Sequence, residues 1–136
     1  MASDEYFRAM IPDADGRPQV GRGARLLGVR VPEDIAVAPT GTVSPGSGGM
    51  SVSPDSAWNV PAHRRPRTYG RGSTGPASDR LYSAGIDAFV GRSLQVRPDP
   101  DAPDVHTFVE PAVVVTVAEY EDSLAATRGD WNVVAP

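Results

Sequence analysis

The chain has 136 residues, 40% of them hydrophobic, and a formal net charge of −4 at pH 7. This length predicts one domain over residues 1–136 with a modest core, while 14 Gly and 14 Pro favour turns and short strands over a helical bundle. The absence of Cys excludes disulfides and thiolate chemistry, two His are too few for a His-built metal site, and the acidic balance argues against a general nucleic-acid binder.

The start of the chain, Met-Ala-Ser-Asp-Glu, is acidic and lacks the basic and apolar regions of a secretory signal peptide. No apolar run reaches about 18 residues, which argues against a transmembrane helix. We therefore expect a cytoplasmic protein with no membrane partner. Delivery into another cell would require a secretion machine that reads no cleavable signal.

Short strands separated by turns are predicted along the first half of the chain. Residues 5–11 fit an aromatic-rich strand that ends at a proline and an Asp-Gly turn. Residues 23–31 fit a short helix followed by a strand, and residues 32–43 fit a small hairpin. A Gly-rich turn then precedes a short strand at residues 50–53.

Residues 54–78 are mostly Pro, Gly, Ser and Arg, and they are predicted to form one long basic loop. Its arginines are Arg64, Arg65, Arg67 and Arg71. Residues 59–98 together carry seven Arg and two Asp, a net charge of +5, whereas residues 99–136 carry one Arg and eight acidic residues, a net charge of −7. The loop fits either a solvated segment that happens to be basic or a phosphate-binding segment.

The last third of the chain contains the strongest strand signal and the clearest helix signal. Residues 94–96 alternate as a short strand, and residues 105–117 predict a longer one, continuously apolar at Val113-Val114-Val115 as in a buried strand. Thr116 with Glu119 three residues later is typical of a capping box.

A helix is therefore expected over residues 117–128, with Gly129 just beyond its end. Trp58 and Trp131 are interpreted as anchors in the core or at its rim. Many short strands with a single clear helix predict an α+β fold.

Three polar residues stand in short apolar runs. Arg8 lies in Tyr6-Phe7-Arg8-Ala9, Ser51 follows a Gly48-Gly49 pair, and Glu110 lies in the run from His106 to Ala112. The order Arg, Ser, Glu resembles the signature of ADP-ribosyltransferases. Together with Asp15-Gly16 and the Tyr120 helix, it more narrowly resembles bacterial toxins of that fold that type VI secretion delivers.

The resemblance implies a small split mixed β-sheet domain of the ADP-ribosyltransferase type, with one C-terminal helix and long Pro/Gly-rich loops. Such proteins hold NAD in a cleft between two small sheets. The implied activity is that of a toxin or effector that uses NAD to ADP-ribosylate an intracellular acceptor. An immunity or antitoxin protein in the producing cell is the implied partner.

Each candidate residue has a chemical role under this interpretation. Arg8 would grip phosphate, because a guanidinium binds phosphate bidentately. Glu110 would stabilise the positive charge that builds on the ribose as the nicotinamide bond breaks, and Ser51 would orient it or the ribose. NAD binding would further involve a close approach of the backbone at Gly49 to the ligand. It would also involve the side chains of Ser53 and His106.

Other interpretations of the same residues stay open. Arg8, Ser51 and Glu110 each also fit a strand residue that faces solvent, and His106 fits a packed strand histidine. Position 108 is Phe where many such transferases have a second glutamate, which leaves the acceptor open. The alternative function is a non-catalytic binding module that holds an acidic protein or RNA through the arginine-rich loop.

Overall fold

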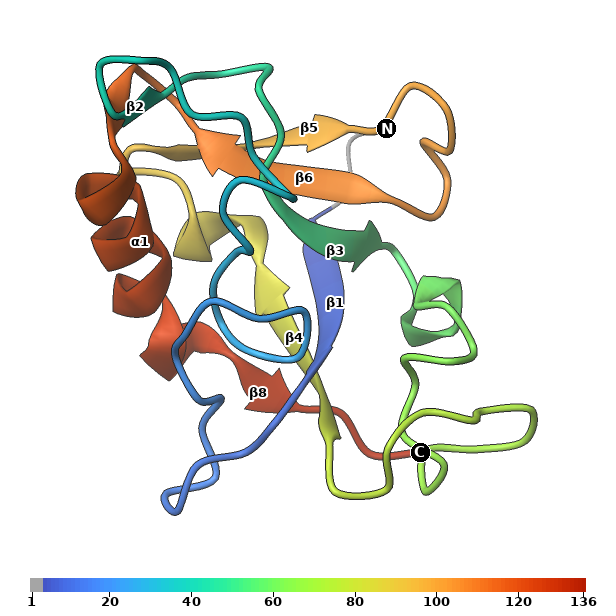
Figure 1. Cartoon of the computed structure of the whole chain (residues 1–136). Coiled ribbons are helices and arrows are strands. Elements are labelled where there is room, and N and C mark those ends of the chain that lie inside the picture. Colours follow the sequence, from blue (N-terminus) through green and yellow to red (C-terminus); the bar gives the residue numbers. More distant parts are fainter. Residues whose placement is uncertain (1–3) are drawn as a thin grey trace.

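A six-stranded sheet in the order β5-β6-β3-β1-β4-β8 organises the computed structural model, which describes residues 4–136 (Figure 1). The first residues of the acidic N-terminal stretch lie outside this range. The strands of the sheet are β1 (Glu5–Met10), β3 (Met50–Pro54), β4 (Arg80–Gly85), β5 (Leu94–Pro98), β6 (Thr107–Pro111) and β8 (Asn132–Val133). A second sheet pairs β2 (Thr42–Val43) with β7 (Val115–Thr116).

Every pair of neighbouring strands in the two sheets is antiparallel. The α+β class is therefore confirmed, but the predicted mixed sheet is wrong. Parallel neighbours need a long crossover connection, usually a helix. Among the described residues the one α-helix, α1 (Val117–Ala126), comes after all the strands of the main sheet except β8, so it connects no parallel pair.

Strand β3 changes partner along its length. Its last residues, Ser53 and Pro54, pair with Phe7 and Tyr6 of β1, whereas residues 50–52 pair with β6. Strands β1 and β6 thus use different halves of β3. The sheet divides at this point, because β1 diverges from the first half of β3 while it continues along β4.

The main core lies on one face of the sheet, against α1. Met50, Val52 and Val109 alternate toward it from β3 and β6, and the helix contributes Tyr120 and Leu124. Among the described residues, Trp131 is the largest fully buried side chain. Its indole N–H donates to Thr127 Oγ1 at 2.9 Å. Trp58, by contrast, stays half exposed at the rim of the molecule.

Helix α1 begins at the predicted capping box and ends before the predicted residue. Thr116 Oγ1 accepts from the Glu119 N–H, and the Glu119 carboxylate accepts from the Thr116 N–H. Thr127 caps the other end through N–H bonds to Leu124 and Ala125 carbonyls. Gly129 therefore does not follow the helix directly but lies in the 3-10 turn Arg128–Asp130, which leads Trp131 into the core.

Three further predictions are wrong in part. The strand expected at residues 105–117 breaks after Pro111, which has no N–H for the ladder, and Val113 and Val114 are 56% and 64% exposed. Residues 23–31 form turns rather than a helix and strand. The expected hairpin at residues 32–43 keeps its turn, but β2 pairs with β7 instead.

The segment between β3 and β4 is a packed part of the fold. Residues 57–59 form a 3-10 turn, and Pro66 and Gly75 form a bridge across the segment. Ala57, Val60 and Tyr69 join Phe7 and Leu81 in a second buried cluster behind β1. The arginines of this segment are therefore held by a folded scaffold.

Among residues 4–136, no helix has the length and apolar character needed to cross a membrane.

Tyr120 joins α1 to the two strands that carry the candidate site residues. Its hydroxyl donates to the Val109 carbonyl and accepts from the Met50 N–H at 3.1 Å. Tyr120→Phe leaves both groups buried without this partner, which costs about 1–3 kcal/mol. We predict that Tyr120→Phe lowers the free energy of unfolding measured with urea by this amount. Tyr69→Phe should leave the urea midpoint nearly unchanged. Equal effects of the two variants would contradict the assignment.

Candidate functional site

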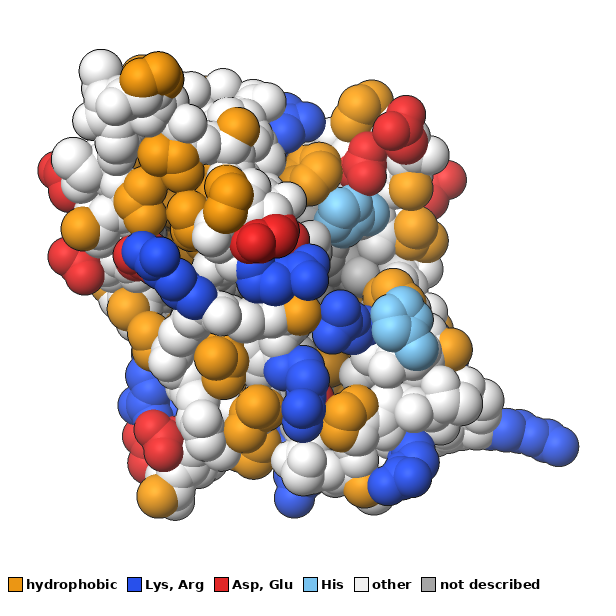
Figure 2. Space-filling model, viewed as in Figure 1, with side chains coloured by type: hydrophobic (Ala, Val, Ile, Leu, Met, Phe, Trp, Pro, Cys, Tyr) orange, Lys and Arg blue, Asp and Glu red, His pale blue; other side chains and the backbone are white. Residues whose placement is uncertain are grey.

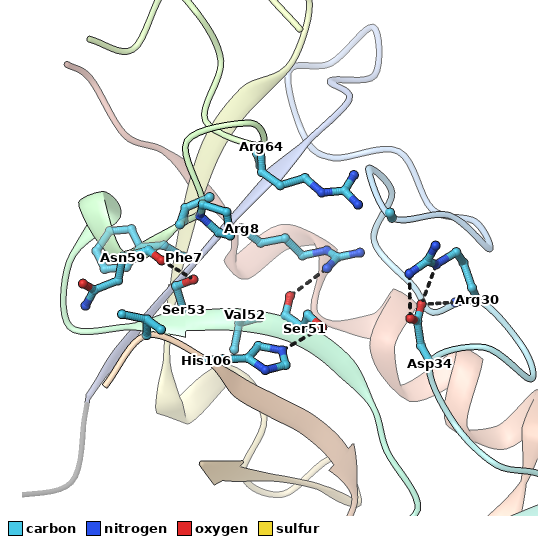
Figure 3. A pocket seen from close by; sticks show the side chains of 15 residues that line it. Phe7, Arg8, Arg30, Asp34, Ser51, Val52, Ser53, Asn59, Arg64 and His106 are labelled. Carbon is cyan, nitrogen blue, oxygen red and sulfur yellow. Dashed lines mark hydrogen bonds and ion pairs between the residues drawn. The ribbon is translucent and has the colours of Figure 1, made fainter. Parts of the chain in front are cut away.

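A cavity of about 320 Å³ opens where β1 diverges from β3 (Figure 3). Phe7, Arg8 and Ala9 line it from β1, and residues 51–53 line it from β3. The remaining walls come from the turns around Arg30 and Asp34, from the segment 59–61 with Arg64, and from His106 before β6. Figure 2 shows basic side chains gathered across the middle of this face, with histidine side chains beside them.

Arg8 reaches across the divide between the strands. It is only 8% exposed, and its Nη1 donates to the Ser51 carbonyl at 2.7 Å. Its Nε and Nη2 donate to the Leu26 carbonyl at 3.2 and 2.9 Å. Longer bonds join Nη2 to Gly23 and Gly28. The guanidinium therefore ties the 23–28 segment to β3, and Nη1 keeps one N–H that none of residues 4–136 accepts.

The charge of Arg8 has no direct ion-pair partner among the described residues. All of its acceptors are neutral carbonyl oxygens. Burial lowers the pKa of Arg8 to about 10, and the neighbouring charges of Arg64 and Arg30 act in the same direction against Asp34. Buried charges are normally paired, so this arrangement favours an anion in the cavity.

Arg64 supplies a second positive charge at the cavity. In Figure 3 its side chain extends in the same direction as that of Arg8. No acceptor for the Arg64 guanidinium is found within residues 4–136. By contrast, Arg30 forms a bidentate pair with Asp34 at 2.9 and 3.0 Å. Arg64 is therefore the cavity arginine that is available to a ligand.

Asp34 is the one carboxylate among the described residues that line the cavity. Burial alone would raise its pKa, but hydrogen bonds from the Arg30 side chain and N–H outweigh that effect and hold the pKa below its ordinary value. Asp34 is thus ionised at neutral pH and places a negative charge near Arg8.

Ser51 and His106 form one end of a hydrogen-bonded chain. His106 Nε2 lies 2.9 Å from Ser51 Oγ, and His106 Nδ1 lies 2.7 Å from Asp99 Oδ2. The hydrogen bond from His106 is the main cause that holds the pKa of Asp99 below its ordinary value, so Asp99 is an acceptor. In the neutral imidazole whose Nδ1 donates to Asp99, Nε2 carries no proton and accepts from the Ser51 hydroxyl.

Glu110 does not line the cavity. It is 1% exposed and accepts from Arg97 Nε at 2.8 Å, Gln95 Nε2 at 2.6 Å and the Gly46 N–H at 3.0 Å. Burial alone would raise its pKa, but these three hydrogen bonds hold the pKa below its ordinary value. In this structure Glu110 ties β5 and the turn at residues 44–47 to β6.

Of the other residues predicted to bind NAD, Ser53 lines the cavity and Gly49 does not. Ser53 lines the cavity, is buried, and donates to the Asn59 carbonyl at 3.3 Å. Gly49 does not line it; a Cβ there would lie 2.5 Å from the Val109 carbonyl oxygen, so its small size serves the packing of β3 on β6. The close approach predicted at Gly49 is therefore an approach of the β6 backbone, not of a ligand.

The arginines of the basic loop do not form one surface. Arg65 is held internally by the Val60 and Trp58 carbonyls and by Ser73, and it lies over the Trp58 ring. Arg67 and Arg71 are exposed away from the cavity, and Arg64 faces it.

The structure thus brings together Arg8, Ser51, Ser53 and His106 of the residues predicted from the sequence. Sequence reasoning missed Asp34 as a cavity carboxylate and Asp99 as the partner of His106. A usable signal existed for Asp99: it follows the strand predicted at residues 94–96, His106 lies at the start of the strand predicted at residues 105–117, and such positions lie side by side in a hairpin.

Comparisons of the chain with protein-family models, with curated proteins and with solved structures found no match. The function is therefore inferred from the chain's own residues. Among residues 4–136, no group of three or more His, Asp or Glu side chains is arranged to hold a metal ion.

The Glu110 contacts predict a specific dependence of stability on pH. Because its pKa is lowered on folding from 4.5, the contribution of Glu110 is complete above that value and is lost as pH falls through the native pKa. Glu110→Gln should cost about 1–3 kcal/mol at pH 7 and flatten the acid limb of a urea-unfolding series.

Glu33→Gln is the matched control, because Glu33 is exposed. It should reproduce the wild-type pH series. An acid limb as steep in Glu110→Gln as in the wild type would show that other groups cause it.

Proposed function

We propose that this chain binds NAD in the cavity between β1 and β3 and transfers its ADP-ribose to an acceptor, as an effector or toxin of the ADP-ribosyltransferase type. The observation that carries the proposal is the buried charge of Arg8, unpaired among the described residues, beside the unpartnered Arg64. A diphosphate supplies the negative charge that this pair of guanidinium groups lacks.

The split of the sheet supports the same proposal. A ligand-binding cleft between two sheet halves is what the resemblance implies, and the cavity lies where β1 leaves β3. Its volume of about 320 Å³ is at the small end of ligand pockets. We infer that the cavity holds the diphosphate with its neighbouring sugar, and that the rest of the dinucleotide extends along residues 59–64.

Cleavage of the bond between nicotinamide and ribose requires a negative charge near the ribose carbon that becomes cationic. Asp34 is the carboxylate on the cavity wall, whereas the carboxylate of Glu110 is enclosed by Arg97 and Gln95. We therefore assign the stabilising role to Asp34 and a positioning role to Glu110. Ser51 contributes a hydroxyl at the same wall.

The alternative, a binding module that holds an acidic protein or RNA through the arginine-rich loop, has less support. A binding surface of this kind needs several free guanidinium groups on one face. Arg65 is already engaged with carbonyls of its own segment, and Arg64 faces the cavity. The positions of Arg64 and Arg65 are consistent with NAD binding in the cavity. They do not form the arginine surface that the binding module needs.

NAD binding should depend on Arg64 and not on the exposed loop arginines. Arg64→Ala removes a charge-assisted contact worth about 1.5–3 kcal/mol, so the Kd for NAD should rise about tenfold or more. Arg71→Ala, which lies outside the cavity, should leave the Kd unchanged. Isothermal titration calorimetry measures both. Equal affinities of wild type and Arg64→Ala, or no binding at millimolar NAD, would contradict the proposal.

The two carboxylates can be separated by the rate of nicotinamide release from NAD. Asp34→Asn should lower the rate about 10²-fold or more without weakening NAD binding, because it removes charge stabilisation in the transition state. Glu110→Gln should change the rate in proportion to the folded fraction only. A loss of rate in folded Glu110→Gln with an active Asp34→Asn would exchange the two roles.

A further inference from the structure

The chain Ser51–His106–Asp99 has the geometry of an activated nucleophile. Its two hydrogen bonds, 2.9 Å and 2.7 Å, fall within the range seen between a nucleophile, its general base and the group that orients the base. Such constellations are recognised by geometry and roles rather than by sequence order. The proposed function requires none of the three to act in this way.

The fold holds the three residues independently of any ligand. Ser51 lies on β3 opposite Phe108 of β6, and His106 directly precedes β6. The Asp99 N–H donates to the His106 carbonyl at 3.0 Å, so the two residues face each other across the mouth of the β5–β6 hairpin. The imidazole packs edge-on against the Phe108 ring, with 4.7 Å between ring centroids. Its orientation is fixed by these contacts.

Ser51 is accessible from solvent, whereas the side chains of His106 and Asp99 are partly buried. Ser51 is exposed and lines the cavity together with His106. The side chains of His106 and Asp99 are 30% and 19% exposed. A serine whose only role was to hold the sheet would not need an acceptor nitrogen that is itself oriented by a carboxylate.

We propose that Ser51 is a nucleophile that accepts an acyl group from small carboxylic esters with an anionic substituent. The cavity selects this class of ester, because Phe7, Val52 and Val60 offer apolar walls, while Arg64 offers a cation with no acceptor among residues 4–136.

The reaction is balanced with water as the only co-reactant. Ser51 Oγ bonds to the ester carbonyl carbon as its proton moves to His106 Nε2, and the bond to the alcohol oxygen breaks as that oxygen takes the proton. Water then attacks the acyl-serine, gives its proton to His106, and releases the acid while Ser51 regains a proton. Asp99 orients the imidazole and stabilises its charged form throughout.

A biotinylated fluorophosphonate tests the nucleophile directly, because it traps activated serines: the Ser51 O–P bond forms, the P–F bond breaks, and fluoride leaves with the serine proton. We expect the folded full chain to be labelled at Ser51, as located by peptide mass spectrometry. Ser51→Ala should abolish labelling, while His106→Gln and Asp99→Asn should slow it about 10²-fold. Urea-unfolded chain should not react.

Matched controls lie elsewhere in the chain. Asp101→Asn lies in the same turn as Asp99, His63→Gln replaces the other histidine, and Ser123→Ala removes a helix serine. Each should label at the wild-type rate. Unlabelled wild type should also hydrolyse the 4-nitrophenyl monoester of succinic acid faster than 4-nitrophenyl acetate, and Arg64→Ala should remove that preference.

The proposal is overturned if folded wild type is not labelled, if labelling spreads over several serines, or if His106→Gln reacts at the wild-type rate. These outcomes are independent of NAD. A chain that binds NAD but resists the fluorophosphonate would disprove the nucleophile alone, and a chain that is labelled but binds no NAD would disprove the proposed function alone.

Discussion

The buried guanidinium of Arg8 is the constraint on which the site depends. It lies where β1 leaves β3, and its bonds to backbone carbonyls join the 23–28 segment to the strand that carries Ser51. The bond from Arg8 to the Ser51 carbonyl connects β1 to the part of β3 that has separated from it. Within residues 4–136 these bonds leave the buried positive charge with no acidic side chain bound to it, and such an arrangement favours an anion nearby.

The carboxylates of Glu110 and Asp34 show how the surroundings of a group decide its role. Glu110 has three hydrogen-bond donors and almost no exposure, so its charge is neutralised within the sheet. Asp34 is also paired, but its partner Arg30 and the carboxylate both face the cavity. The charge of Asp34 can therefore act on a ligand, whereas that of Glu110 mainly holds β5 and β6 together.

Local chemistry made several elements predictable from the sequence. The capping box at Thr116, the strand at residues 50–53 and the strand that contains Arg8 depend on neighbouring residues, and all three are observed. Positions that depend on distant contacts were not predictable. Glu110 looked like a site residue because it is the one acid in an apolar run, and only the pairing of β5 with β6 shows that Gln95 and Arg97 enclose it.

The most direct test of the account is an NMR titration of the amide-labelled chain with NAD, with inorganic pyrophosphate as a smaller probe. Both ligands should shift the amides of Phe7, Val52 and Arg64 and leave those of β8 unchanged, because the diphosphate would lie between β1 and β3. No shifts at millimolar NAD, or shifts confined to surfaces away from this cavity, would contradict it.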